Sequence, residues 1–346
     1  MRKVLLMLVV LSMLVVTVQC APKATPTPTP KPKFKVGMIS DVGGIDDASF
    51  NQNTWEGVER AIKELGIEGK FLESKSEADY IPNITEFVEQ KYDLIITVGF
   101  LLANATKQAA EQYPDQKFAI VDFAYDPPIP NVQGIVFNAN EAAFLGGYLA
   151  AAMAEVKDPK DPKIGYVGGM KIPPVEQFIV AYEKGMEYYN EKYGKNVQLL
   201  GVYVGDFEAP DQGKIKANSL IDEGVDVLFG AGGKTGAGAL AAARERGIWG
   251  IGVDVDQYYT LPNEKSILIT SIMKKLDNAV FDTIKETMNG NFKGGGVYLG
   301  TLANGGVGLA PFHEFEDKVP EQIKKDLEEI KQGIIEGKID TGWPPK

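Results

Sequence analysis

The fold of this 346-residue chain follows from the stretch FKVGMISDVGGIDDASFNQNTWEGVERAIKEL, residues 34–65. Residues 34–40 form a short, mostly apolar run that predicts a buried strand. After a polar loop, residues 53–65 carry apolar side chains at helical spacing, namely Trp55, Val58, Ile62 and Leu65. A buried strand followed by an amphipathic helix is the repeating unit of doubly wound α/β proteins.

The same alternation continues along the chain. Further apolar runs of strand length lie at residues 94–98, 118–122, 164–167, 197–204, 225–229, 250–253 and 267–270. They predict an α/β fold with parallel central sheets. More than 300 residues follow the N-terminal segment, and single domains commonly hold about 100 to 200, so we expect two Rossmann-like lobes. We assign residues 34–138 with about 268–306 to the first lobe, and 139–267 with about 307–341 to the second.

The first 33 residues predict export. Arg2 and Lys3 precede an apolar run that is shorter than the roughly 20 residues needed to span a bilayer, so residues 1–20 are interpreted as a secretory signal. Cys20, the only cysteine, is the expected lipidation site of a cell-membrane lipoprotein. The alternative is an unmodified cysteine near a cleavage site, because Gln19 is not the small residue that usually precedes a lipidated one. Residues 21–33, rich in Pro, Thr and Lys, predict a semi-rigid spacer.

Charge and composition limit the function. The formal net charge is −11, which disfavours nucleic acid as a partner, since phosphates require clustered Lys and Arg. His313 is the only histidine, and neither a Ser-His-Asp set nor a metal-ligand pattern is visible. We therefore expect no catalysis, no metal and no cofactor, and a chain that acts as a monomer.

Polar residues gather where predicted strands end. The first strand leads into the acidic residues 41–47, and later strands lead into Asp122, the glycine-rich residues 230–238 and Asp254. In parallel sheets ligands bind at these ends. Ionised carboxylates accept strong hydrogen bonds from hydroxyls, which indicates ribose or another sugar as the ligand, although each aspartate could equally be a helix cap.

Two nucleotide-binding patterns and one enzyme pattern fit less well. The glycine-rich loop lacks the phosphate-loop spacing, because Leu228 stands where that motif needs glycine, and Thr235 replaces the third glycine of the dinucleotide fingerprint. Residues 41–47 resemble the calcium-holding cluster of nucleoside hydrolases, but the leading aspartate is missing and one extra residue follows Asp41. A calcium-dependent hydrolase is kept as the alternative from another functional class.

Residues 41–57, DVGGIDDASFNQNTWEG, resemble the opening motif of the basic membrane protein family of lipoproteins. Further matches are residues 140–147, the loop after Phe229, and residues 252–257 and 270–275, so the resemblance spans about 34–311. It implies a type I periplasmic-binding fold with three crossovers between the lobes. It also implies a purine nucleoside receptor, for guanosine, inosine or adenosine, that serves the permease and ATPase of an ABC importer. A sugar receptor of the same fold is the nearer alternative.

The resemblance also implies roles for individual residues. Phe50 and Phe207 would stack on the purine base, Asp254 and Lys274 would hold the ribose hydroxyls, and Asp41 with Asn51 would reach polar edges of the ligand. Three further residues are expected to line the cleft: Asp122, Phe178 and Gly233. Before the motif is considered, the aromatic rings could equally be ordinary core residues.

Overall fold

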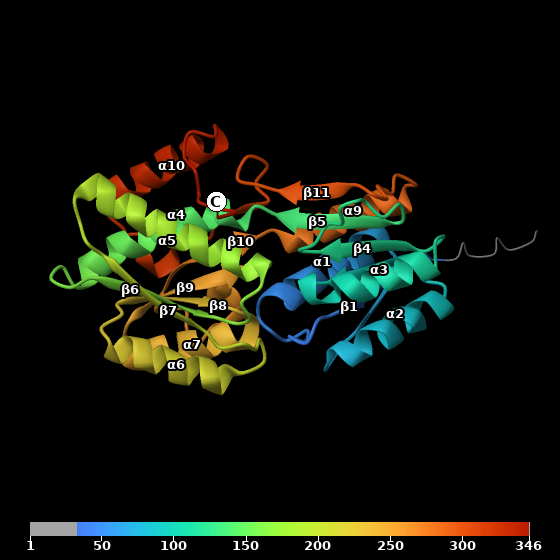
Figure 1. Cartoon of the computed structure of the whole chain (residues 1–346), viewed down its shortest axis with the longest axis horizontal. Coiled ribbons are helices and arrows are strands. Elements are labelled where there is room, and N and C mark those ends of the chain that lie inside the picture. The colour runs from blue at the N-terminus through green and yellow to red at the C-terminus, as the bar shows by residue number, and fades with distance from the viewer. Residues whose placement is uncertain (1–32, 346) are drawn as a thin grey trace, which may run out of the picture. The chain divides into compact units, whose positions relative to one another are not determined.

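The computed structural model describes residues 33–345 and contains two six-stranded sheets (Figure 1). The first sheet has the order β11 (Val297–Gly300), β5 (Val132–Phe137), β4 (Lys117–Val121), β3 (Leu94–Val98), β1 (Lys35–Ile39) and β2 (Glu68–Leu72). The second has the order β12 (Val307–Leu309), β10 (Leu268–Lys274), β9 (Trp249–Asp254), β8 (Val227–Ala231), β6 (Lys163–Gly168) and β7 (Gln198–Tyr203). All pairs are parallel except β10 with β12.

The two sheets have equivalent strand orders. Each strand of one sheet has a counterpart at the same place in the other, so that β4 corresponds to β9 and β5 to β10. The predicted α/β architecture with two parallel sheets is confirmed. The equivalence means that the loops after β4 and β9 occupy matching positions in the two lobes.

Helices cover both faces of each sheet. In the first lobe they are α1 (Phe50–Leu65), α2 (Tyr80–Glu89), α3 (Ala103–Gln112) and α9 (Leu276–Met288). In the second lobe they are α4 (Ala139–Lys157), α5 (Pro173–Tyr193), α6 (Pro210–Asp222), α7 (Gly233–Arg246), α8 (Gln257–Thr260) and α10 (Glu321–Ile335). Short 3-10 turns complete the set: Glu77–Asp79, Phe100–Leu102 and His313–Phe315. Because helices lie on both faces, β3, β8 and β10 are buried at every position.

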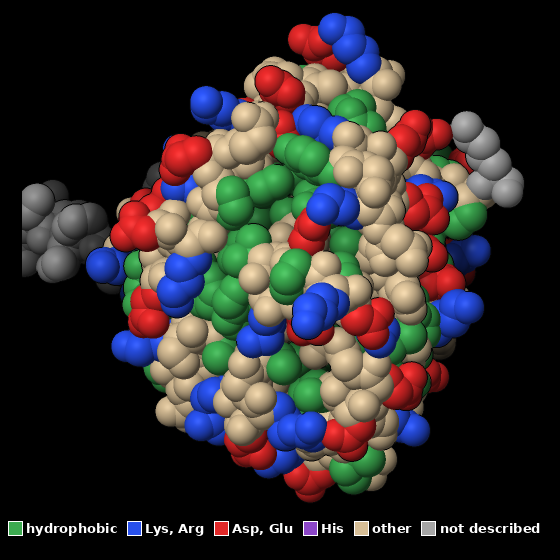
Figure 2. All heavy atoms as spheres, turned by 90° about the vertical axis from the view of Figure 1, so that its left-hand side faces the viewer, with side chains coloured by type: hydrophobic (Ala, Val, Ile, Leu, Met, Phe, Trp, Pro, Cys, Tyr) green, Lys and Arg blue, Asp and Glu red, His purple; other side chains and the backbone are tan. Residues whose placement is uncertain are grey.

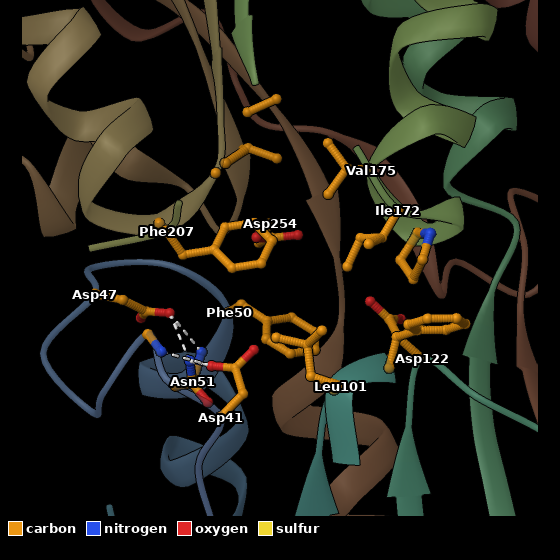
Figure 3. A pocket seen from close by; sticks show the side chains of 18 of the residues that line it. Asp41, Asp47, Phe50, Asn51, Leu101, Asp122, Ile172, Val175, Phe207 and Asp254 are labelled. Atoms are coloured by element: carbon orange, nitrogen blue, oxygen red, sulfur yellow. Dashed lines mark hydrogen bonds between the residues drawn. The ribbon is translucent and has the colours of Figure 1, made fainter. Parts of the chain in front are cut away.

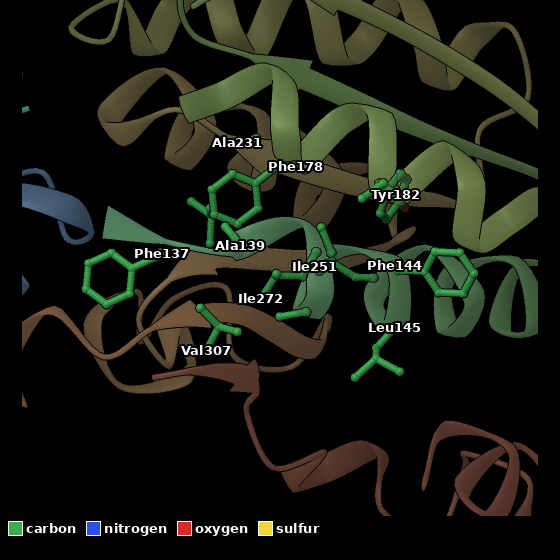
Figure 4. Packing of buried hydrophobic residues seen from close by; sticks show 14 of the residues in the cluster. Phe137, Ala139, Phe144, Leu145, Phe178, Tyr182, Ala231, Ile251, Ile272 and Val307 are labelled. Atoms are coloured by element: carbon green, nitrogen blue, oxygen red, sulfur yellow. The ribbon is translucent and has the colours of Figure 1, made fainter. Parts of the chain in front are cut away.

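The core is continuous around α4 and α5. Side chains from α4, α5 and the strands of the second sheet interdigitate there (Figure 4). Gly147 of α4 and Gly185 of α5 allow the two helices to touch, because a Cβ at either position would overlap the backbone of the other helix. The Ala- and Gly-rich composition of α4 is therefore a packing requirement.

The chain passes between the lobes three times, as the resemblance implied. The crossings lie at Asn138 after β5, at Lys275 after β10, and at residues 301–306 between β11 and β12. Backbone hydrogen bonds connect them: Asn138 N donates to Gly300 O over 2.8 Å, and Lys275 N donates to Gly306 O over 2.9 Å. Three adjacent crossings of this kind are short enough to act as a hinge.

One expected boundary needs correction. Residues from about 268 onward were assigned to the first lobe, but β10 (Leu268–Lys274) pairs with β9 and β12 in the second sheet, and the crossing comes after it. A fully buried apolar run fits the interior of either sheet, so its partner strands cannot be deduced from local sequence.

The predicted signal segment, Cys20 and all but the last residue of the predicted spacer lie outside the described residues. Within residues 33–345, no helix is long and apolar enough to cross a membrane. On the face shown in Figure 2, basic and acidic side chains are interspersed, without a continuous basic surface.

Candidate functional site

A cavity lies between the carboxyl ends of strands from both sheets. The space between its lining atoms, open solvent at its mouth included, is about 610 Å³. All nine residues predicted from the sequence line this one cavity: Asp41, Phe50, Asn51, Asp122, Phe178, Phe207, Gly233, Asp254 and Lys274. The structure thus brings them together, and their contact with a ligand stays a prediction.

Lys274 lies at the centre of the site. Its side chain is 3% exposed, and Nζ lies 2.6 Å from Asp122 Oδ2 and 3.2 Å from Asp254 Oδ1. Asp122 directly follows β4 and Asp254 ends β9, the equivalent strands of the two lobes. Both aspartates have left-handed backbone, with φ of 58° and 63°, a conformation that Asp tolerates better than most residues. Matching turns therefore direct two carboxylates, one from each lobe, at one ammonium group.

The charges in this cluster do not balance. Burial lowers the pKa of Lys274, but the carboxylates of Asp122 and Asp254 outweigh it, so the net shift is upward and the ammonium stays charged. Burial also raises the pKa of Asp122, an effect that Lys274 offsets only in part. Two acids against one base leave an excess of acceptors, which favours a ligand with hydroxyl or N–H donors over an anionic one.

A second polar cluster lies at the start of α1. Asn51 Nδ2 donates to Asp41 Oδ1 over 2.8 Å and lies 3.1 Å from Asp47 Oδ2. The Asp47 carboxylate also accepts backbone N–H groups from Ser49 (3.0 Å), Asn51 (2.8 Å) and Gln52 (3.1 Å). Asp47 thus stabilises the first turn of α1, while Asp41 faces the cavity.

Both carboxylates of this cluster are shifted toward neutral pH. Burial, only partly offset by hydrogen bonds, raises the pKa of Asp41 to about 6 and that of Asp47 to about 7. Burying a charged carboxylate costs free energy, so each holds its proton to a higher pH than a solvated aspartate does. The site therefore changes charge in the physiological range of pH.

Three buried oxygens in the cavity wall lack a hydrogen-bond partner among the described residues: Asn51 Oδ1, Asp122 Oδ1 and Asp254 Oδ1. The last of these has only its ion-pair contact with Lys274. An unsatisfied buried polar group costs about 1 to 3 kcal/mol. All three are acceptors, so a ligand that supplies donors at these places would recover that free energy.

Aromatic rings form the remaining walls. Phe50, the first residue of α1, and Phe207, in the loop between β7 and α6, lie on opposite sides of the cavity (Figure 3). Lys274 Nζ lies 4.5 Å from the centroid of the Phe50 ring and 5.4 Å from that of Phe178. Phe178 is buried and also belongs to the core cluster, so it both lines the cavity and packs the second lobe (Figure 4).

Sequence reasoning missed a set of lining residues. They are Gly43, Asp47, Gly99, Phe100, Leu101, Ile172, Pro174, Val175, Ala231, Gly232 and Val253. Asp47 lies within the acidic stretch that drew attention to Asp41. Gly99, Phe100 and Leu101 directly follow the predicted strand at 94–98. Their place at a strand end could have indicated the cavity, but none of them carries the polar side chain by which Asp122 and Asp254 were recognised.

The acidic residues are not arranged as a cation site. Over residues 33–345, no group of three or more His, Cys, Asp or Glu side chains is placed to hold a metal ion. Asp41 and Asp47 are instead separated by the amide of Asn51, which donates to the first and lies within hydrogen-bonding distance of the second.

Residues 34–341 match the Bmp family, described as "ABC transporter substrate-binding protein PnrA-like". The chain belongs to this family. It is 36% identical to an uncharacterised lipoprotein of Pyrococcus abyssi, covering 97% of this chain and 87% of that protein. It is 31% identical to the ABC transporter nucleoside-binding protein BmpA of Lactococcus lactis, covering 88% of both.

A solved structure agrees with this assignment. An ABC transporter solute-binding protein of Aeropyrum pernix superposes with a TM-score of 0.83 at 31% identity, covering 89% of this chain and 92% of that one. The chain is therefore a substrate-binding protein of the Bmp family with the expected fold. Such proteins are binding components of ABC transporters and not enzymes, which favours the receptor interpretation over the hydrolase.

Proposed function

We propose that this Bmp family protein is an exported, lipid-anchored receptor that binds a purine nucleoside in the cavity and delivers it to an ABC permease. The observation that carries the proposal is the combination of two aromatic rings that line the cavity from different lobes, Phe50 and Phe207, with a cluster of buried acceptors around Lys274. A purine offers two apolar faces for the rings, and its ribose offers hydroxyl donors for the acceptors.

We expect the two polar clusters to bind different parts of the nucleoside. Asp122, Asp254 and Lys274 would hold the ribose, since a diol can donate to the carboxylates while it accepts from the ammonium. Asp41 and Asn51, at the start of α1, would contact the edge of the base, whose N–H groups are donors. The excess of carboxylates opposes a phosphate, so the nucleoside is expected without one.

Relatives support the ligand and the anchor. The Lactococcus lactis relative is named as nucleoside-binding, and the Pyrococcus abyssi relative is named as a lipoprotein. Cys20 and the spacer of residues 21–33 supply what tethering requires, a lipid attachment point and a connection to the folded body.

The test is ligand identification followed by calorimetry. Mass spectrometry of molecules that co-purify with the protein, and titration with guanosine, inosine, adenosine, ribose and free guanine, would compare the candidates. We expect tight binding of at least one nucleoside, which is recovered unchanged. Binding of sugars with no preference for a base would indicate the sugar receptor, and release of free base and ribose would indicate the hydrolase.

A further inference from the structure

One lysine forms an ion pair between the two lobes, next in sequence to residues that line the cavity. Lys234 Nζ lies 2.6 Å from Asp46 Oδ1 and 2.9 Å from Glu208 Oε2. Asp46 belongs to the loop between β1 and α1 in the first lobe, whereas Glu208 and Lys234 belong to the second lobe. These three residues, called here the Lys234 bridge, connect the lobes by charge.

Each residue of the bridge is adjacent to a residue that lines the cavity. Asp46 precedes Asp47, Glu208 follows Phe207, and Lys234 follows Gly233. Each residue of the bridge is therefore next to the cavity wall in sequence: Asp46 and Glu208 lie in loops, one of which carries Phe207, and Lys234 lies in the first turn of α7. A change in the bridge would be transmitted to the wall without removing any group that the ligand would touch.

The Phe207 loop is held to its own lobe by other bonds. Thr235 N donates to Phe207 O over 3.1 Å, and Thr235 Oγ1 donates to Asp206 O over 2.7 Å. These contacts are made within the second lobe and would persist if the lobes separated. The Asp46 link is the part of the bridge that must break when the cleft opens, since its partners lie on opposite lobes.

We infer that Lys234 is a positioning residue that holds the Phe207 loop against the first lobe and thereby slows release of the bound ligand. This rests on the proposed function for the ligand itself. The side chain of Asp46 is 75% exposed, so the link is weakened by solvent and by salt. An exposed ion pair of this kind is expected to change the release rate about two- to fivefold at low ionic strength, and less at high salt.

The test compares Lys234→Met with Lys214→Met. Lys214 is a matched control, because it pairs with Glu245 over 2.8 Å between α6 and α7 of the second lobe, and no residue across the cleft within 33–345 forms an ion pair with it. Release of guanosine would be followed by stopped-flow fluorescence at low and high salt. We expect about two- to fivefold faster release for Lys234→Met at low salt, restoration by Lys234→Arg, and no change for the control.

A double-mutant cycle with Asp46→Asn isolates the cross-lobe link. If Lys234 acts through Asp46, the two substitutions together should accelerate release no more than the stronger one alone. Unchanged release in Lys234→Met, or additive effects in the double variant, would overturn the inference. Asp46→Asn also serves if Lys234→Met fails to fold, because Asp46 is largely exposed.

A readout without ligand separates this inference from the proposed function. Small-angle scattering of the ligand-free protein at low salt should show a larger radius of gyration for Lys234→Met than for the wild type. Lys214→Met should have the same radius of gyration as the wild type. If the wild type binds no nucleoside but this difference is seen, the proposed function fails and the bridge stands. Identical scattering of all three proteins would contradict the bridge.

Discussion

Replacement of Phe50 by alanine tests the site most directly. The ring starts α1, is partly buried, and faces the cavity opposite Phe207 (Figure 3). Stacking of a base on an aromatic ring contributes about 1 to 3 kcal/mol. Since about 1.4 kcal/mol corresponds to a tenfold change in Kd, Phe50→Ala should weaken nucleoside binding about 5- to 150-fold.

The fold should survive this change. Alanine is a good helix former, and the first turn of α1 keeps its hydrogen bonds to Asp47. Phe292→Ala is a suitable control, because Phe292 is a partly buried ring that packs on the core away from the cavity. Phe50→Tyr retains the ring and should bind within a few-fold of the wild type.

Isothermal titration with guanosine, together with thermal melting of each variant, provides the measurement. Phe50→Ala should lose affinity for guanosine, while Phe50→Tyr and Phe292→Ala should keep it. Unchanged guanosine affinity in a folded Phe50→Ala protein would refute the stacking assignment, because a ring that stacks on the base must contribute to the affinity.

Three further changes have defined outcomes. Asp254→Asn removes a charged acceptor, for which hydrogen bonds contribute about 1.5 to 3 kcal/mol, so guanosine should bind roughly 10- to 150-fold more weakly and the preference over 3′-deoxyguanosine should shrink in calorimetry. Burial raises the pKa of Asp41 from 3.8 in the unfolded chain to about 6 in the folded protein. Between these two pH values the folded state binds more protons than the unfolded state, so the contribution of Asp41 to the free energy of unfolding falls as pH rises. Asp41→Asn should therefore gain in melting temperature relative to the wild type from about pH 4 to pH 6, and a constant difference over that range would contradict the shift. Asp326→Ala leaves the buried Tyr148 hydroxyl without its acceptor, so it should cost about 1 to 3 kcal/mol in denaturant unfolding, and any folded fraction should bind guanosine normally.

The strands that the sequence predicted share one property. Residues 94–98 and 225–229 are mostly apolar, interrupted only by Thr97 and Asp226, because helices cover both faces of the strands there, and this pattern is local. The strands that escaped detection are less regular. β2 (Glu68–Leu72) carries charged residues and is partly exposed at the sheet edge, β5 (Val132–Phe137) contains Gln and Gly, and β11 (Val297–Gly300) is short and exposed.

The site residues could be predicted from the sequence for a different reason. Asp122 and Asp254 could be proposed because strand ends are where parallel sheets place their ligands, and Lys274 followed from a family motif. No spacing in the sequence could show that Lys274 would pair with Asp122, 152 residues away, since that contact exists only after two sheets face one another.

The sequence by itself therefore determined which segments form strands and helices, their order, and the polar groups at their ends. Apolar runs and helical spacing are patterns of residues that are close together in the sequence. Only the tertiary structure decided that β10 belongs to the second sheet, that matching left-handed turns direct Asp122 and Asp254 at one ammonium, and that Lys234 reaches Asp46 across the cleft. These features depend on contacts between residues far apart in the chain, and such contacts are fixed by the packing of whole sheets.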